Sequence, residues 1–209
     1  MAQARALDTG DMEQVLAHVS TGRHAHRNRC FILLTHLAGL RVGEVACLRW
    51  SDVMTADGQI KQEIRLLPEM TKGKHARTVF VSKRLAQELQ YYADIYRREA
   101  PLDYPLFYSQ KGVRTGFSAN SLTQTIANLY RGAGLDGATS HSGRRSFLTN
   151  LANKGTAIHL LRTLAGHRSI STTATYLYSS PSQLKAAVEL VWLQLKHEPK
   201  PPSAHSVWL

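Results

Sequence analysis

The sequence predicts a mainly α-helical fold with one small antiparallel β-sheet. Amphipathic segments with helical spacing recur along the 209 residues, and two follow a Ser that can cap a helix. Two short segments with partly alternating polar and apolar residues flank a basic turn that contains glycine. The sequence contains no internal repeat. A chain of this length can bury a hydrophobic core as one domain.

Three helices are expected in the first fifty residues. Acidic residues open an amphipathic segment at 8–20. The second helix, at 25–39, ends at Gly39 and places four apolar residues on one face: Phe31, Leu34, Leu37 and Ala38. A short helix at 43–49 follows.

The predicted sheet comes next. Residues 59–67 and 76–81 are its two strands, and Gly73 lies in the turn between them. Ser82 is placed to cap a helix that runs to about Glu99.

The second half of the chain is expected to be helical. Pro101 and Pro105 interrupt it, and Ser118 can cap a helix that ends near 132–134. Short helices are then predicted at about 143–153, 156–164, 170–177 and 182–196. We therefore expect one domain over 1–198 and a flexible, Pro-rich tail over 199–209.

The charge balance limits the chemical class of the binding partner. Lys and Arg number 26 against 15 Asp and Glu, a net charge of +11 with a pI near 10. Such a surplus favours a polyanionic partner, either nucleic acid or an anionic membrane. The membrane is disfavoured, because no apolar run approaches the roughly 18–20 residues of a membrane span. The N-terminus lacks the apolar region of a signal peptide.

The cysteines and one histidine pair are expected to have no catalytic or metal-binding role. Cys30 and Cys47 lie in apolar, helix-like stretches, so we expect two reduced core residues in a cytoplasmic protein. His24 and His26 have no acidic or cysteine ligand nearby in sequence. The basic segment around them is better explained as the start of a helix that contacts phosphate.

Two arginines are candidates for holding a phosphate group. Arg144 follows His141 by three residues, so both can share one face at the start of a helix. Arg41, in the turn after Gly39, could supply a second guanidinium fork. Two such forks would stabilise the charge of a pentavalent transition state. We expect no metal, because no carboxylate cluster suited to Mg²⁺ is present in the sequence.

Tyr176 is the candidate nucleophile. A phenol is protonated at neutral pH and needs a base or a positive field. His141 is placed to act as the base and His167 as a hydrogen-bond donor, while Lys72 in the hairpin turn suits the general acid and Lys74 competes for that role. Any one of these residues alone would usually be structural, so the prediction depends on their joint spacing.

Four sequence blocks resemble the tyrosine recombinases, also called the phage integrase family. In order, they are AGLRVGE (38–44), TKGKHARTVFV (71–81), HSGR (141–144) and LAGHRSISTTATY (164–176). The interval of nine residues from His167 to Tyr176 also matches the family. The resemblance implies the catalytic-domain fold of that family, helices around a small sheet, and a 3′-phosphotyrosine intermediate formed without metal, ATP or another cofactor.

The resemblance assigns roles to individual residues. It implies six catalytic residues: Arg41, Lys72, His141, Arg144, His167 and Tyr176. Five residues separate Lys72 from TVFV (78–81), as in the hairpin of the family, and Glu44 is expected to orient Arg41. Further cations are expected to contact DNA: Arg23, Arg27, Lys74, Arg77, Arg145 and Arg168.

The chain departs from the family pattern in three places. We expect no N-terminal core-binding domain, as in the fimbrial phase-variation recombinases, which are similarly short. The usual H-x-L-R-H reads H-S-G-R-R, and Gly143 would cost roughly 1 kcal/mol inside a helix, so the helix is expected to start there. Arg145 replaces the second histidine, and Ala165 stands where Leu is common.

The resemblance implies a site-specific recombinase that integrates, excises or inverts DNA between specific sites. It implies a homo-tetramer on double-stranded DNA, joined through the apolar helix at 182–196, with accessory DNA-bending proteins, in the bacterial cytoplasm with the nucleoid. The alternative for that helix is packing on its own core. Two alternative functions are DNA relaxation like that of type IB topoisomerases and a DNA-binding regulator that does not cut.

Overall fold

The computed structural model describes residues 4–71, 73–97, 100–109, 115–177, 184–185 and 187–189. The chain divides into two units, Met1–Tyr176 and Leu177–Leu209. In the second unit, residues 184–185 and 187–189 are helical. The remainder of the helix predicted at 182–196, the predicted boundary after 198 and the predicted tail at 199–209 lie outside the described residues.

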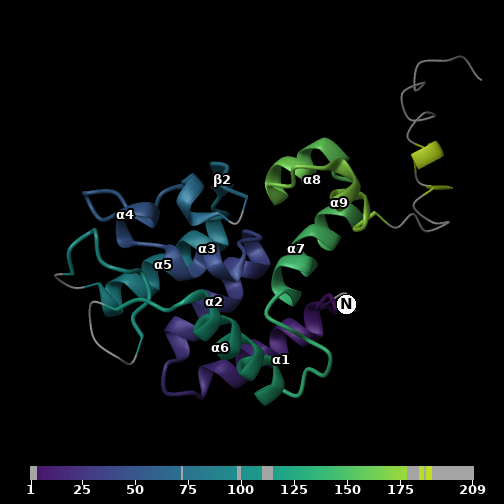
Figure 1. Cartoon of the computed structure of the whole chain (residues 1–209). Coiled ribbons are helices and arrows are strands. Elements are labelled where there is room, and N and C mark those ends of the chain that lie inside the picture. The colour runs from purple at the N-terminus through teal and green to yellow at the C-terminus, as the bar shows by residue number, and fades with distance from the viewer. Residues whose placement is uncertain are drawn as a thin grey trace, which may run out of the picture. The chain divides into compact units, whose positions relative to one another are not determined.

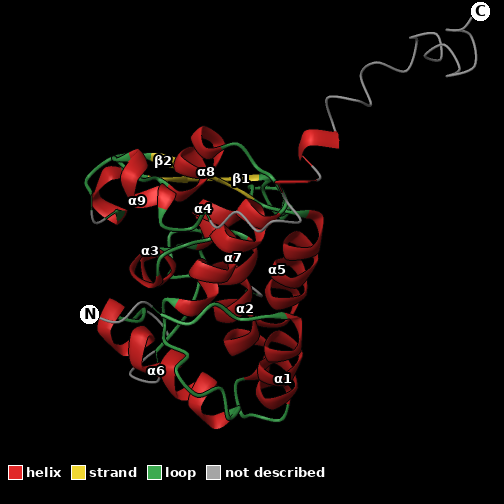
Figure 2. Ribbon diagram, turned by 90° about the vertical axis from the view of Figure 1, so that its right-hand side faces the viewer, coloured by secondary structure: helices red, strands yellow, loops and turns green. Residues whose placement is uncertain are grey.

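The first unit is mainly helical, as predicted, with one two-stranded sheet (Figures 1 and 2). Its described helices are α1 (Thr9–Ser20), α2 (Ala25–Leu37), α3 (Val42–Cys47), α4 (Trp50–Val53), α5 (Lys83–Tyr96), α6 (Ala119–Gly132), α7 (Ser142–Asn153), α8 (Ile158–Ala165) and α9 (Ile170–Ala174). The short helix α4 and the 3₁₀ turn η1 (Pro68–Met70) were not predicted.

Polar side chains cap three of the helices, and the two serine caps were predicted. The side chain of Asp8 accepts the backbone N–H of Asp11 at the start of α1. Ser82 and Ser118 cap α5 and α6 in the same way. Each cap satisfies a backbone donor that the first turn of a helix cannot pair internally.

Helix α2 is the central helix of this unit. Residues 30–35 are all buried, and α2 contacts α1, α3, α5, α6 and α7. The single apolar face predicted for this segment is therefore too narrow, because neighbours cover the helix on several sides. At its C-terminal end, Gly39 has a φ of +62°, a left-handed conformation that favours glycine.

The sheet is smaller than predicted. Strands β1 (Glu63–Leu66) and β2 (Arg77–Phe80) are antiparallel, with Glu63 opposite Phe80 and Leu66 opposite Arg77. Ile64, Leu66 and Val79 point into the core. Because the two strands pair, the loop that connects them lies beside the candidate active site.

One cysteine differs from the prediction. Cys30 is buried as expected, but Cys47 is exposed. Helix α3 buries Val42, Glu44 and Val45. At 100° per residue, Cys47 falls on the opposite, outer face of this short helix.

Candidate active site

The carboxylate of Glu44 joins two arginines at the start of α3. Glu44 is 1% exposed; its Oε1 lies 2.8 Å from Arg41 Nη1, and its Oε2 lies 2.6 Å from Arg77 Nη2. The same carboxylate accepts the backbone N–H of Arg41 at 2.7 Å. Burial opposes the charge on Glu44, but the hydrogen bonds and charges of Arg77 and Arg41 outweigh it and lower the pKa. The predicted orientation of Arg41 by Glu44 has this geometric basis.

Three guanidinium groups meet at the C-terminal end of α8. Arg77 Nη1 donates to the carbonyl of Leu164 at 2.8 Å, and Arg144 Nη2 donates to the carbonyl of Ala165. Arg41 Nη2 also donates to Ala165 at 3.3 Å and to the carbonyl of Gly166 at 3.4 Å. The last carbonyls of a helix lack internal partners and carry partial negative charge, which stabilises cations there.

Glycine is required where α8 ends. Gly166 has a φ of +59°, and a Cβ on it would lie 2.5 Å from Arg77 Cδ. A side chain at this position would therefore be strained and would also displace Arg77. This contact explains the glycine of the Gly-His pair in physical terms.

Arg144 is the deepest of the three arginines. It is 7% exposed, and Arg144 Nη1 donates to the carbonyl of Gly39. Burial, and then the charges of Arg41 and Arg77, lower the pKa of Arg144 to about 9. The group is therefore still charged at neutral pH.

Helix α7, which carries Arg144, packs closely on α2. A Cβ on Gly143 would lie 2.3 Å from Thr35 Oγ1 and 3.2 Å from the Tyr130 hydroxyl. Helix α7 starts at Ser142, so the predicted start at Gly143 is correct to one residue. Gly143 therefore allows the close approach that brings Arg144 against Gly39.

His167 lies between Arg144 and α9. Its Nε2 is 3.3 Å from Arg144 Nη2, and its Nδ1 is 3.1 Å from Thr173 Oγ1. Burial, followed by the charges of Arg144, Arg41 and Arg77, lowers the pKa of His167 to about 4. Since a guanidinium only donates, Nε2 accepts from Arg144. The predicted donation by His167 to the phosphate stays a prediction.

The ring of Tyr176 stacks on His167. Their centroids are 6.0 Å apart and their planes differ by 20°. The guanidinium carbon of Arg145 lies 5.8 Å from the centre of the tyrosine ring. Arg145, predicted as a DNA contact, is thus also in cation–π contact with the candidate nucleophile.

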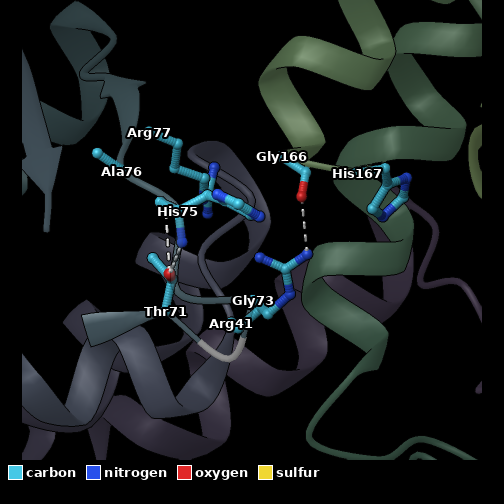
Figure 3. Close-up of a pocket in the computed structure, with 8 residues that line it drawn as sticks. All are labelled: Arg41, Thr71, Gly73, His75, Ala76, Arg77, Gly166 and His167. Atoms are coloured by element: carbon cyan, nitrogen blue, oxygen red, sulfur yellow. Dashed lines mark hydrogen bonds between the residues drawn. The ribbon is translucent and has the colours of Figure 1, made fainter. Parts of the chain in front are cut away.

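A pocket of about 480 Å³ opens beside these groups (Figure 3). Its walls are Arg41, Thr71, Gly73, His75, Ala76, Arg77, Gly166 and His167. Thr71 Oγ1 accepts the backbone N–H of His75 and donates to its carbonyl, which closes the turn between the strands. A cavity lined by two guanidinium groups and two imidazoles is suited to an anion.

Of the predicted catalytic residues, Arg41 and His167 line this pocket, and Arg144 and Tyr176 contact His167. Lys72 lies outside the described residues. His141 precedes α7 with an exposed imidazole, and no hydrogen bond of that imidazole is found within the described ranges. Lys74, the competing acid, is exposed in the hairpin turn with a φ of +51°. Arg144 is buried and His141 is exposed, and their predicted shared face stays a prediction.

The predicted DNA-contacting cations fall into two groups. Arg23, Lys74 and Arg168 are exposed. By contrast, the Arg77 side chain is only 7% exposed and is bound to Glu44. Arg27 stacks on Phe117, with 5.0 Å from its guanidinium carbon to the ring centre, and burial lowers its pKa. Arg77 is therefore paired with the buried Glu44 carboxylate, and its predicted contact with DNA stays a prediction.

Sequence reasoning missed two residues of the site. His75 lines the pocket from the turn, and Thr173 binds His167 from α9. His75 lies within the TKGKHAR segment, three residues after Lys72, which is the signal that could have identified it. Thr173 lies among four other Ser and Thr residues of similar appearance, and only burial distinguishes it.

The described residues contain no cluster of three His, Cys, Asp or Glu side chains placed to hold a metal ion. None of the helices in these ranges combines the length and the apolar character that a membrane crossing requires.

Comparison with known proteins places the chain in a family. The model of the phage integrase family matches residues 5–183. Tyrosine recombinase XerA from Pyrococcus furiosus is 30% identical over 163 residues, which are 78% of this chain and 54% of XerA. The chain spans about half the length of the curated relatives it matches.

Solved structures show the same fold. A crystal structure of XerA recombinase superposes with a TM-score of 0.71 and 23% identity, covering 96% of this chain and 68% of that one. The Tn1549 transposon integrase in complex with transposon right end DNA gives a TM-score of 0.71 at 17% identity, covering 92% and 67%. With the family model matching most of its length, this chain belongs to the phage integrase family.

Proposed function

We propose that this chain cuts and rejoins DNA as a tyrosine-type site-specific recombinase, in an integration, excision or inversion reaction. One observation carries the proposal. Arg41 and Arg144 meet at the end of α8, and His167, bonded to Arg144, stacks on Tyr176. Two guanidinium groups beside an anion-sized pocket and a phenol are the parts that metal-free phosphoryl transfer needs.

In the proposed step, the Tyr176 oxygen forms a bond to the scissile phosphorus, and the bond from phosphorus to the 5′ oxygen breaks. Arg41 and Arg144 neutralise the non-bridging oxygens. The phenol gives up its proton to His141 or to water, and the leaving 5′ oxygen takes a proton from Lys72, or from Lys74 in its place. The products are a 3′-phosphotyrosine and a free 5′ hydroxyl. Attack by a second 5′ hydroxyl reverses the step, so no nucleotide or other cofactor is consumed.

The proposed partner is double-stranded DNA at specific recombination sites, consistent with the net charge of +11. We further propose a homo-tetramer on DNA, joined through the segment 182–196, with accessory DNA-bending proteins. Acting on chromosomal DNA would place the protein in the bacterial cytoplasm with the nucleoid.

A suicide-substrate assay tests the proposal. Purified protein is incubated with nicked duplexes from the DNA that flanks its own gene, and denaturing gels are examined for a covalent protein–DNA band. The band should form with the wild type and with Tyr91→Phe, which changes an exposed tyrosine elsewhere, and should vanish with Tyr176→Phe. A band that survives in Tyr176→Phe would overturn the assignment of the nucleophile.

The same proteins separate the alternatives. A topoisomerase would relax supercoiled DNA without a partner site. A regulator would bind DNA and give no band with any variant. The affinity of Tyr176→Phe for DNA should fall as salt is added. A plot of log binding constant against log salt concentration should have a slope of about −0.9 per phosphate contacted. A slope near zero would argue against DNA as the ligand.

A further inference from the structure

Thr173 connects two residues of the candidate site. It lies in α9 and is fully buried. Its Oγ1 is 3.1 Å from His167 Nδ1, and its backbone carbonyl accepts the N–H of Tyr176 at 3.0 Å. One residue therefore holds the imidazole through its side chain and the candidate nucleophile through its backbone.

The contacts of His167 define its tautomer. Arg144 can only donate a hydrogen bond, so His167 Nε2, at 3.3 Å, must carry a lone pair. In a neutral ring the proton then lies on Nδ1, which faces the Thr173 hydroxyl. The lowered pKa of His167, about 4, keeps the ring neutral at pH 7. The order of donors is thus Arg144 to His167 to Thr173.

We propose that Thr173 is a positioning residue, which accepts the Nδ1–H that Arg144 leaves on His167, fixes the orientation of the ring and thereby aligns Arg144 and Tyr176. The catalytic consequence rests on the proposed function. The Thr173 hydroxyl can accept or donate and so serves either tautomer, whereas the alternative tautomer would set an Nε2–H against an Arg144 donor. Rotating the ring to avoid this clash would break its stacking on Tyr176.

The hydroxyl, and not the volume of the side chain, carries this role. Thr173→Val keeps the branched shape and replaces the acceptor with a methyl group. Thr173→Ser keeps the acceptor and removes a methyl group. Thr172→Val is the matched control, because Thr172 is the exposed neighbour in the same helix.

The first test needs no DNA. The ring nitrogens of His167 are observed by ¹⁵N NMR of the free protein, with the signals assigned by comparison with His167→Gln. The wild type, Thr173→Ser and Thr172→Val should show the Nδ1–H form with the chemical shift of a hydrogen-bonded Nδ1, and Thr173→Val should lose that shift because Nδ1–H has no acceptor. An Nε2–H ring in the wild type would overturn the proposal, whether or not any variant folds.

The second test is the rate of covalent adduct formation on the nicked duplex. Loss of an orienting hydrogen bond behind a functional imidazole in metal sites costs about 10- to 100-fold, and we expect a similar loss of rate in Thr173→Val. DNA affinity should be unchanged, and Thr173→Ser should recover most of the rate. The proposal would be overturned if Thr173→Val formed the adduct at the wild-type rate. It would also be overturned if Thr173→Ser and Thr173→Val lost the same fraction of that rate.

Failure of the two proposals can be distinguished. A wild type that forms no adduct but shows an Nδ1–H hydrogen bond that depends on Thr173 would contradict the proposed function and leave the positioning of His167 standing. Adduct formation by the wild type, together with an unchanged Nδ1 shift in Thr173→Val, would support the proposed function and overturn the positioning role.

Discussion

Arg77 Nη2 lies 2.6 Å from Glu44 Oε2, and both side chains are almost fully buried. The two residues come from different elements, the start of β2 and the first turn of α3. Glu44 also binds Arg41, while Arg77 also binds the end of α8. One buried carboxylate thus fixes the sheet, α3 and α8 around the pocket, and it partly offsets the charge of three arginines.

Glu44→Gln should destabilise the protein. Breaking a buried ion pair by removing one partner typically costs about 3–5 kcal/mol, because the other charge is left buried. We expect a loss of that order in the free energy of unfolding, measured by urea denaturation. Glu69→Gln, at an exposed position, should change stability by no more than about 0.5 kcal/mol. Similar stabilities for both variants would contradict the role given to Glu44.

The same carboxylate predicts a pH dependence. The pKa of Glu44 is lower in the folded protein than its ordinary value of 4.5. Its contribution to stability is therefore present in full above pH 4.5 and is lost as the pH falls through the lowered folded value. Unfolding curves of the wild type should show this loss, and Glu44→Gln should show a shallower decline. The prediction would be refuted if the stabilities of the wild type and Glu44→Gln fell equally with pH below 4.5.

Gly166→Ala should cost more stability than Gly155→Ala. Both glycines have positive φ, +59° and +78°, so each alanine is expected to pay roughly 1–2 kcal/mol of backbone strain. Only at Gly166 would the new Cβ meet Arg77, while nothing lies within 4 Å at Gly155. We expect a further ~1–3 kcal/mol at Gly166 from this overlap. Thermal unfolding measures both, and equal losses would show that the contact with Arg77 is unimportant.

Gly143→Ala should destabilise although its backbone is helical. The added Cβ would lie 2.3 Å from Thr35 Oγ1, and forcing α7 away from α2 should cost about 1–3 kcal/mol. Gly43→Ala, in a helix with the nearest atom 3.7 Å away, should instead gain about 0.5–1 kcal/mol. A double-mutant cycle with Thr35→Ala, which removes the clashing oxygen, should recover part of the loss. Additive effects would exclude this contact as the cause.

Binding of DNA should raise the pKa of His167. In the free protein burial and three arginine charges hold it at about 4. A phosphate beside Arg41 and Arg144 would offset those charges and favour the protonated ring, which could then donate to the phosphate. NMR titration of Tyr176→Phe with and without a duplex measures the change. An unchanged or lower pKa would mean that the phosphate does not lie beside His167.

Much of the fold could be predicted because its signals are local. The Asp8, Ser82 and Ser118 caps start helices where expected, since a cap depends only on the residues that follow it within one turn. The short elements α4 and η1 were missed, because three or four residues carry too little periodicity to detect. Cys47 was misplaced because which face of α3 is buried depends on its neighbours.

The candidate site likewise combines features that the sequence predicts with features that depend on tertiary contacts. The sequence by itself determined the helical class, the positive charge and the ordered blocks that contain Arg41, Arg144, His167 and Tyr176, because residue type and spacing are properties of the chain. Only the tertiary structure decided that Arg77 neutralises Glu44, that His167 accepts from Arg144, and that Thr173 holds both His167 and Tyr176. Burial, charge pairing and the direction of a hydrogen bond depend on groups that meet across 33, 23 and 6 residues of chain, and no local pattern encodes which partners will meet.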